Sequence, residues 1–480
     1  MVYAPYFMIR FMKKILSTIC MVLISISTVW AYDVELDGIY YNLDKEKMTA
    51  EVTYKDTYYY HYSGTVEIPA SISVEGKKYT VTTIGVEAFR DCERVSKVVI
   101  PNSVTTIGDY AFSYCYTLSE IVIPNSIDSI GNYAFTQCSR GLKSIELPNS
   151  LKNIGAGIFR SCYSLQSVKL GNSLPKISAE MFGDCQSLES IEIPESVTTI
   201  EERAFSYCIK LANVEIPNSV TTIGGSAFSG CSALKEIVIP NSVTTIGGSA
   251  FLSCSALENI TFGDNITRVG SSAFAATAWY SNLPDGEIYI GKILYGYKGT
   301  MPANHSLIVK EGIVSIADNA FSFCTNLISI KLPESLEHIG AGAFALSQLK
   351  NIEIPYAVTR IEFQSFANCN NLEFIKVLGS TPPSIDEYTF SNYEVPLYVP
   401  QGSLETYKNT EIWNRFSNIE GFDATGIENI ITEKIDGDVK IYTPSGTLVQ
   451  RTKNYNGTPQ LPKGIYVIKQ GNISKKIFVK

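Results

Sequence analysis

A phrase of thirteen residues occurs twice in this chain without a single difference. Residues 216–228 and 239–251 both read IPNSVTTIGGSAF, and the two copies lie 23 residues apart. Looser versions run through most of the sequence, and each ends in a phenylalanine. These markers are Phe89, Phe112, Phe135, Phe159, Phe182, Phe205, Phe228, Phe251, Phe274, Phe321, Phe344, Phe366 and Phe390. Such a period is typical of a solenoid, in which each coil completes the core of the last.

One period, residues 234–257, shows how a coil closes. It opens with the spacing Leu-x-x-Ile-x-Ile, whose last two positions alternate as in a half-buried strand. Pro240 has no N–H to donate and ends the strand. The spacing of Ala, Phe and Cys over residues 250–254 indicates a short helical or 3₁₀ turn. The sequence therefore predicts an α/β-type repeat solenoid with short parallel strands.

In several coils a glycine lies four residues before the marker phenylalanine. The same position is filled elsewhere by Glu201, Glu362, Ser178 and Ala317. A position that required positive φ would rarely accept glutamate or alanine. We interpret it as a tolerant turn.

The repeated phrase resembles the BspA-like leucine-rich repeats of bacterial surface proteins, including those of Bacteroidetes. It has the form Ile-Pro-x-Ser-Val-x-x-Ile-Gly-x-x-Ala-Phe-x-x-Cys and extends over roughly residues 80–420. In most coils a proline stands at the strand end, where generic leucine-rich repeats carry an asparagine ladder. The resemblance implies a surface protein that adheres to host matrix proteins or to other bacteria.

The first 31 residues are expected to form a secretory signal peptide, beginning at Met1 or at Met12. Lys13-Lys14 precede an apolar stretch, and Val29-Trp30-Ala31 ends in a small residue suited to cleavage. The apolar stretch is short for a membrane span, and no later stretch could cross a membrane. The expected location is extracellular or the outer-membrane surface.

Residues 32–80 lack the period and are rich in tyrosine, which predicts an irregular β cap on the first coil. The long step from Phe274 to Phe321 is expected to hold a β-hairpin island at about 279–304, projecting from the solenoid. Within it, Trp279 and Tyr280 are candidate contact residues, although packing of the island onto the coils is the alternative. Residues 391–420 should form the terminal cap, with Leu397-Tyr398-Val399-Pro400 as the last strand.

After a linker at 421–426, the composition changes. Residues 427–480 hold nine Lys or Arg against four acids, and three of its segments alternate as strands do. We expect a small all-β, sandwich-like domain. Its Leu-Pro-x-Gly-Ile-Tyr-Val and Lys-Ile-Phe-Val-Lys phrases resemble the C-terminal sorting domain of the type IX secretion system of Bacteroidetes. That resemblance implies recognition by the secretion machinery.

Ten cysteines follow Cys20, and each stands three residues after a coil phenylalanine. They are Cys92, Cys115, Cys138, Cys162, Cys185, Cys208, Cys231, Cys254, Cys324 and Cys369. An even count in an exported chain usually indicates disulfides. Stacked coils are about 4.8 Å apart with parallel Cβ vectors, however, whereas a disulfide needs converging ones. We predict a ladder of buried free thiols.

Nothing in the sequence indicates an enzyme, a cofactor or a metal site. The three histidines, His61, His305 and His338, have no ligand partner at motif spacing, and no phosphate loop or nucleophile elbow occurs. The formal net charge of −8 argues against nucleic acid as a partner.

The outward positions of the coil strands vary most, and repeat proteins commonly bind partners on such a face. The middle of this face is acidic, and the alternative is a charged surface that only keeps the array soluble. The candidate residues are Glu120, Glu146, Glu192, Glu215, Glu236, Trp279 and Tyr280. We expect an exported scaffold that binds an extracellular protein. A glycan-binding protein that uses the aromatic residues of the cap or island is the alternative.

Overall fold

The computed structural model describes residues 32–56, 60–422, 435–443, 448–455, 464–470 and 473–479. The chain divides into two compact units, Met1–Pro284 and Asp285–Lys480, called unit 1 and unit 2 below. The expected signal peptide, residues 423–426 of the expected linker, and Tyr58 and Tyr59 of the cap lie outside the described residues.

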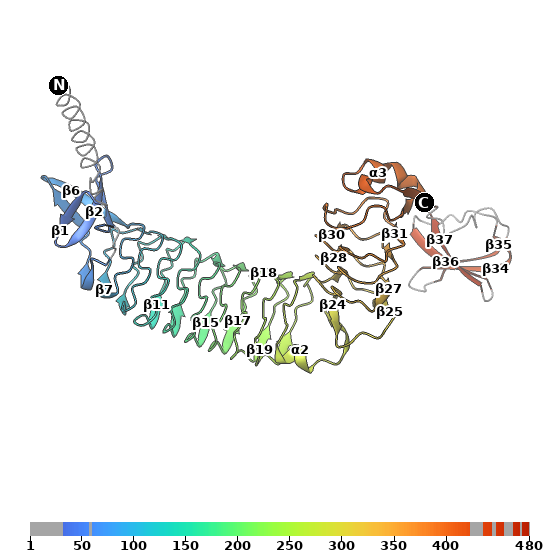
Figure 1. The fold of residues 1–480 in the computed structure, drawn as a ribbon, viewed down its shortest axis with the longest axis horizontal. Coiled ribbons are helices and arrows are strands. Elements are labelled where there is room, and N and C mark those ends of the chain that lie inside the picture. The colour runs from blue at the N-terminus through green and yellow to red at the C-terminus, as the bar shows by residue number, and fades with distance from the viewer. Residues whose placement is uncertain are drawn as a thin grey trace, which may run out of the picture. The chain divides into compact units, whose positions relative to one another are not determined.

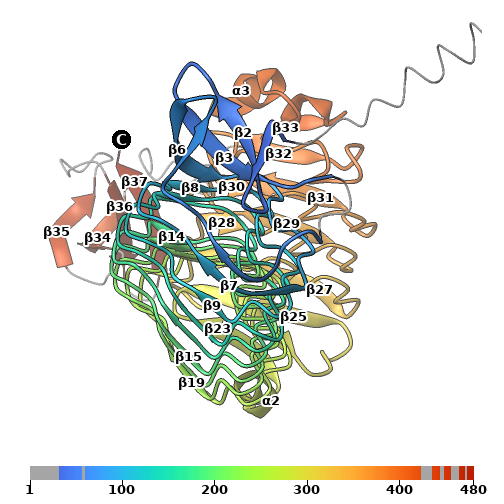
Figure 2. The same cartoon turned by 90° about the vertical axis from the view of Figure 1, so that its left-hand side faces the viewer.

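The coils of unit 1 place their strands in two rows (Figures 1 and 2). The first row holds β7 (Arg94–Val99), β9 (Glu120–Ile121), β11 (Ser144–Glu146), β13 (Ser167–Lys169), β15 (Ser190–Glu192), β17 (Asn213–Glu215), β19 (Glu236–Val238) and β21 (Asn259–Thr261). The second row holds β8 (Thr106–Ile107), β10 (Ser129–Ile130), β12 (Asn153–Ile154), β14 (Lys176–Ile177), β16 (Thr199–Ile200), β18 (Thr222–Ile223), β20 (Thr245–Ile246) and β22 (Arg268–Val269). Paired strands are parallel, and equivalent residues of successive coils face each other, as Ile237 faces Ile260. The predicted repeat solenoid is confirmed.

A run of tight turns around the phenylalanine closes each coil. The N–H groups of Ala250, Leu252 and Cys254 donate to carbonyl oxygens three residues earlier, as in 3₁₀ structure. The intervening N–H groups donate to the next coil instead; that of Phe251 lies 2.7 Å from the Ala273 oxygen. The turns therefore alternate with coil-to-coil hydrogen bonds.

This alternation requires left-handed backbone on both sides of the phenylalanine. In the same coil, Ser249 has a φ of 56° and Ser253 a φ of 59°. The glycine slot two residues earlier has no such requirement, because neither Gly247 nor Glu201 has positive φ. The slot does not need positive φ, as expected, but it is not freely tolerant, because a Cβ on Gly247 would lie 2.4 Å from the Gly225 nitrogen of the preceding coil. The left-handed positions lie two and six residues after the slot.

The phenyl rings form a continuous stack through unit 1 from Phe89 to Phe274. Phe228 is fully buried between Phe205 and Phe251, with ring centroids 5.1 and 5.2 Å away and interplanar angles of 11° and 5°. In unit 2 the stack runs from Phe321 to Phe390. Aromatic pairs at these separations are favourable beyond the area they bury.

All ten cysteines after Cys20 are free, as predicted, and nine of them are buried. In eight of them the thiol donates to the phenylalanine carbonyl of the preceding coil. The Cys254 Sγ, for instance, lies 3.0 Å from the Phe228 oxygen. Burial raises the pKa of the Cys92 thiol to about 12 and that of the Cys115 thiol well above its ordinary value. These two thiols therefore stay neutral and unreactive in the folded protein.

An antiparallel sheet begins unit 1. β1 (Val34–Leu36), β2 (Ile39–Asp44) and β3 (Thr49–Thr53) pair in order, and β3 then pairs in parallel with β6 (Lys77–Ile84), which leads into the second row. β5 (Ser71–Val74) is antiparallel to β6, and β4 (Ser63–Glu67) starts the first row beside β7. The Tyr62 ring covers Phe89 at 4.4 Å and so begins the aromatic stack.

The expected hairpin after unit 1 forms, but it does not project as an island. β23 (Gly286–Ile290) and β24 (Ile293–Lys298) are antiparallel, and β24 pairs in parallel with β26 (Ser315–Ile316), followed by β28 (His338–Ile339) and β30 (Arg360–Ile361). The hairpin is thus the first part of the second row of unit 2. Its buried face explains this position, because Ile288, Ile290, Ile293 and Leu294 are all buried.

The first row of unit 2 continues to the end of the array. It holds β25 (His305–Ile308) with β27 (Leu327–Lys331), then β29 (Asn351–Ile354), β31 (Phe374–Val377), β32 (Leu397–Pro400) and β33 (Ile419–Phe422). The expectation that β32 is the last strand is wrong, since β33 pairs beside it. Between them lie η1 (Gln401–Ser403), α3 (Leu404–Asn409) and η2 (Trp413–Arg415), which bury Tyr407 and Trp413.

The described part of the tail is one antiparallel sheet. β34 (Ile435–Tyr442), β35 (Leu448–Tyr455), β36 (Gly464–Gln470) and β37 (Ile473–Val479) pair in the order β35-β34-β36-β37. No helix within the described ranges has the length and apolar character needed to cross a bilayer.

The aromatic stack predicts opposite costs for two changes in unit 1. Phe228→Ala should lower the free energy of unfolding by about 3–5 kcal/mol, because it leaves a cavity between two rings. Deleting residues 229–251, one whole period, should do less harm, because Leu252 then follows Phe228 in register. Thermal unfolding of both variants checks this. A deletion that unfolds the chain while Phe228→Ala barely changes it would contradict the coil geometry.

The buried thiols give a second prediction. Folded protein should react slowly with a thiol reagent at pH 8, whereas the same chain in denaturant should expose about ten equivalents after Cys20 without any reductant. Burial raises the folded-state pKa of thiols such as Cys92 and Cys115. The stability that these thiols contribute is therefore full below about pH 8.5 and is lost at higher pH, where the unfolded thiols ionise first. Fewer than ten reactive thiols in denaturant would indicate disulfides.

Candidate partner-binding face

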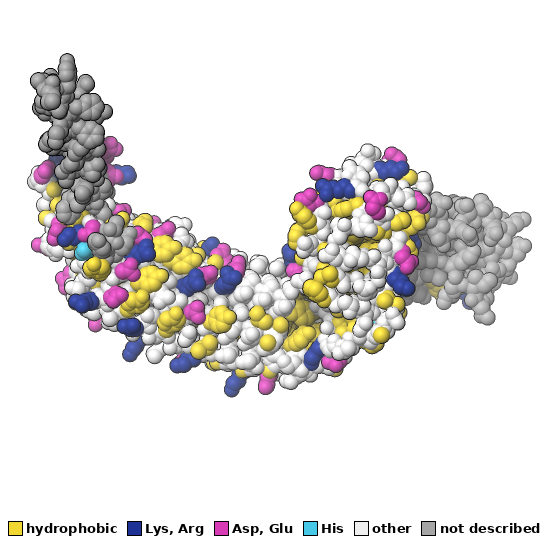
Figure 3. All heavy atoms as spheres, in the orientation of Figure 1, with side chains coloured by type: hydrophobic (Ala, Val, Ile, Leu, Met, Phe, Trp, Pro, Cys, Tyr) yellow, Lys and Arg dark blue, Asp and Glu magenta, His cyan; other side chains and the backbone are white. Residues whose placement is uncertain are grey.

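The five candidate glutamates all lie on the first row, with exposed side chains. Glu146, Glu192 and Glu215 occupy one line of outward positions, and Glu120 and Glu236 occupy the other. Figure 1 places β11, β15, β17 and β19 along the lower margin of unit 1, and in Figure 3 charged side chains project from that margin. The structure thus brings the glutamates to one face.

Ion pairs divide these glutamates into two groups. Lys97 pairs with Glu120 at 2.8 Å, and Lys169 pairs with Glu146 at 2.5 Å, in each case one coil apart. These two carboxylates are neutralised on an exposed surface, where such pairs contribute little to stability. We therefore exclude both from the candidate site.

The other three carboxylates form no ion pair or hydrogen bond with any described residue. Glu192 and Glu215 face each other directly in the pairing of β15 with β17, and Glu236 is on the adjoining strand β19. Like charges placed opposite each other in a sheet are destabilising. This part of the face, called the acidic patch below (Glu192, Glu215 and Glu236), carries an uncompensated electrostatic cost.

A shallow groove of about 1150 Å³ lies over the acidic patch. Its lining comes from strands β15, β17, β19 and β21 and from the turns that follow them, among them Pro194, Pro217 and Pro240. Val238, 62% exposed, adds an apolar side chain beside the carboxylates. The groove can therefore offer both charged and apolar contacts to an extended partner surface.

Trp279 and Tyr280 are not part of this face. They belong to the short helix α2 (Ala278–Asn282), whose N-cap is Thr277. The Trp279 ring packs edge-on against Phe262 and Phe274, with centroids 5.4 Å away in both cases. Both candidate residues are half-buried. For Trp279 the alternative therefore holds: its side chain packs onto the coils.

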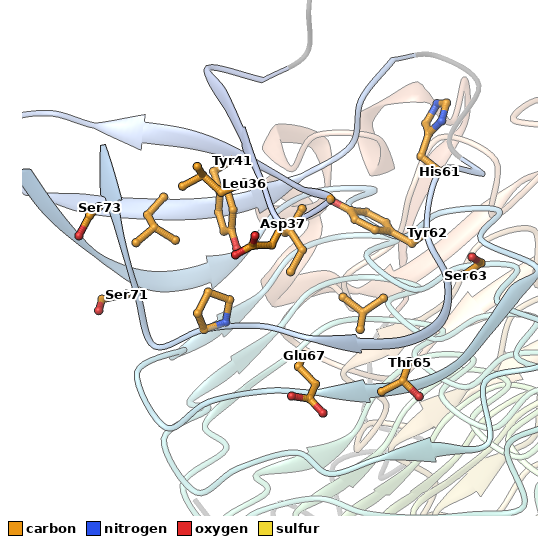
Figure 4. A pocket seen from close by; sticks show the side chains of 15 residues that line it. Leu36, Asp37, Tyr41, His61, Tyr62, Ser63, Thr65, Glu67, Ser71 and Ser73 are labelled. Carbon is orange, nitrogen blue, oxygen red and sulfur yellow. The ribbon is translucent and has the colours of Figure 1, made fainter. Parts of the chain in front are cut away.

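The cap tyrosines are also used for packing. Tyr40, Tyr41 and Tyr62 are buried, and the Tyr62 hydroxyl donates to the Thr53 carbonyl at 2.6 Å. Among the described cap tyrosines, Tyr60 alone is exposed. A cleft of about 810 Å³ opens beside them and is shown in Figure 4, where Asp37 lies close to Tyr41 and the Glu67 side chain stands apart from both. Buried rings offer no face on which a sugar could stack.

Unit 2 contains a side-chain hydrogen-bond network that the sequence analysis did not predict. Ser315 Oγ lies 3.2 Å from His338 Nδ1, and His338 Nε2 lies 3.1 Å from Glu362 Oε1, which also receives Arg360 Nε at 2.9 Å. Ser315 is 2% exposed, so no substrate can reach its hydroxyl as a nucleophilic serine requires. This network links three successive coils. Its signal in the sequence was the spacing of 23 residues between Ser315 and His338.

The described ranges contain no group of three or more His, Cys, Asp or Glu side chains placed to hold a metal ion. His61 pairs with Asp56 at 2.9 Å, and His305 packs its ring against Tyr297. Each histidine therefore has a local structural contact.

The parallel rows, the aromatic stack and the short turns define a leucine-rich repeat solenoid, an architecture typical of scaffolds that bind partners along a repeated face. The profile described as BspA type leucine rich repeat region matches residues 71–189, 175–284 and 295–412. The chain belongs to the BspA-type leucine-rich repeat family. Among curated proteins, the comparison finds no match.

Three solved structures illustrate the similarity. A leucine-rich repeat protein from Bacteroides ovatus is 28% identical over 82% of this chain and 100% of that one, with a TM-score of 0.42. A leucine-rich repeat protein from T. pallidum is 30% identical over 42% and 90%, with a TM-score of 0.37. A leucine rich cell surface protein from Faecalibacterium prausnitzii is 24% identical over 81% and 98%, with a TM-score of 0.38.

Proposed function

We propose that this protein is an exported cell-surface scaffold whose acidic patch binds the basic surface of an extracellular protein. The observation that carries the proposal is the contrast along the first row. Lysines neutralise Glu120 and Glu146, whereas three adjacent carboxylates at the groove have no counter-charge. A partner that supplies Lys or Arg would relieve their mutual repulsion, and complementary charge also speeds association.

The surface location draws on three supports: the expected signal peptide, the BspA-type family, and the similarity to a protein described as a cell surface protein. Adhesion to matrix proteins or to other bacteria is what the family resemblance adds. Among the described aromatic residues that the glycan alternative would use, three cap tyrosines are buried and Trp279 packs against the coils. The binding experiment below tests this glycan alternative directly.

The test compares two triple variants with the same net charge. Glu192→Lys, Glu215→Lys and Glu236→Lys reverse the acidic patch, while Glu46→Lys, Glu311→Lys and Glu373→Lys reverse three exposed glutamates elsewhere. The wild-type protein is first screened on arrays of matrix proteins, bacterial surface proteins and glycans. We expect binding to a protein that weakens as salt rises, is abolished by the patch variant and persists in the control.

Thermal unfolding accompanies the binding measurement. Both variants should unfold near the wild-type temperature, because all six side chains are exposed. Retained binding by the patch variant would refute the acidic patch as the site. Binding to the glycan array alone would instead support the alternative function.

We also propose that residues 427–480 direct the protein through the type IX secretion machinery. The supports are the resemblance of its sequence phrases and the four antiparallel strands β34–β37. In a host with this secretion system, a chain that ends at residue 426 should accumulate in the periplasm, whereas the full chain reaches the cell surface. Fractionation with surface proteolysis measures this. Normal surface display of the shortened chain would show that another segment carries the address.

A further inference from the structure

The start of unit 2 repeats the construction at the start of unit 1. In unit 1 the antiparallel pair β2–β3 is followed by a parallel pairing of β3 with β6, which enters the second row. In unit 2 the antiparallel pair β23–β24 is followed by a parallel pairing of β24 with β26, which enters the second row there. The same two steps therefore begin both arrays.

The first rows start alike as well. β4 pairs in parallel with β7, and the register shifts between Gly64 and Thr65. β25 pairs in parallel with β27, and the register shifts between His305 and Ser306. Both starting strands thus carry an irregularity near their first residue, a feature that discourages further strands from pairing at an edge. Strands β1 and β5 are additions that unit 1 alone contains among the described elements.

The two units also end alike. A tryptophan closes the aromatic stack in each: Trp279 packs on Phe274 with centroids 5.4 Å apart, and Trp413 packs on Phe390 at 6.0 Å. Each lies in or beside a short helix that breaks the coil pattern, α2 in unit 1 and α3–η2 in unit 2. Bulky aromatic closure of an exposed coil core is what a terminal cap has to provide.

Each unit also has strand rows that come to an end. β22 is the last strand in its sheet, as β12 is within unit 1, and β23 is the edge strand of the sheet β23-β24-β26-β28-β30. The ring stack continues past β12 through Phe135, Phe159 and Phe182, whereas after β22 it ends at Phe274 with Trp279. A hydrophobic cluster in unit 2 runs from Leu294 to Phe416 and draws all its buried members from that unit. In a repeat array each coil is stabilised by its neighbours alone, so a place where the strand row and the ring stack both end divides the array.

We infer that the 47-residue step is an internal cap, and that the chain carries two separately capped solenoids which fold and unfold independently. Unit 1 bears the acidic patch, and unit 2 is a second body. The long step in the repeat is the sequence mark of this division. It separates two arrays that would otherwise read as one.

The chain provides one natural probe for each unit. Its three tryptophans are Trp30, Trp279 and Trp413. In the full chain with Trp30→Phe and Trp413→Phe, fluorescence reports the end of unit 1. With Trp30→Phe and Trp279→Phe, it reports the end of unit 2. Each background serves as its own reference, so the effect of removing a tryptophan cancels.

Two matched core changes are placed in both backgrounds. Phe228→Ala lies in unit 1 and Phe321→Ala lies in unit 2, and both rings are fully buried. Phe321 is nearer to Trp279 in sequence than Phe228 is, so distance along the sequence alone would predict the opposite result. We expect Phe228→Ala to lower the unfolding midpoint reported by Trp279 and to leave that of Trp413 unchanged. Phe321→Ala should do the reverse.

The result that overturns the inference is a shared response. If Phe321→Ala lowers the Trp279 midpoint as much as the Trp413 midpoint, the coils form one cooperative array across residue 284. Should an alanine variant fail to fold, Phe228→Leu and Phe321→Leu give the same comparison with smaller cavities.

Discussion

The coil-to-coil hydrogen bond on the phenylalanine side is the interaction on which the rest of this structure depends. The Phe228 N–H donates to the Ala250 carbonyl at 2.7 Å, and the same contact recurs from Phe89 to Phe251 in unit 1 and from Phe321 to Phe366 in unit 2. It sets the rise of one coil on the next, and that rise brings the phenyl rings to centroid distances of 4.9–5.8 Å in unit 1. Both strand rows inherit the spacing, because each coil is closed. The ordered face of exposed side chains is a consequence of this repeat.

The repeat made the fold predictable, but it did not indicate which residues adopt left-handed backbone conformations. Identical residues at a fixed spacing indicated which side chains stack, so the burial of Phe228 and the free cysteines followed from the period. The left-handed positions did not, because they hold Tyr110, Glu180 and Arg203 in different coils. Side-chain identity normally signals positive φ through glycine. Here the alternating hydrogen bonds impose it on whatever residue occurs.

The sequence predicted the acidic patch only in part. Outward alternation identified the glutamates, but two of the five proved to be neutralised. That distinction was also available, since Lys97 and Lys169 lie 23 residues from Glu120 and Glu146 and must therefore be their neighbours in the next coil. The groove could not be predicted, because its lining combines four strands with the turns that follow them. The role of Trp279 was hidden for a similar reason: it packs on Phe262, a residue outside the repeated phrase.

The cysteine ladder shows how a repeat chain of this kind can keep its thiols free. The Phe228 carbonyl accepts the N–H of Cys231 at 3.1 Å and the Sγ of Cys254 at 3.0 Å. The slot thus requires a short side chain that is apolar enough for the core and can still donate one hydrogen bond. Thr277 and Ser347 also fill it, and the Thr277 hydroxyl donates to the Phe274 carbonyl. A disulfide between neighbouring coils would remove two such donors and leave two buried carbonyl groups with one partner fewer, an outcome that disfavours the bond even where an oxidant is present.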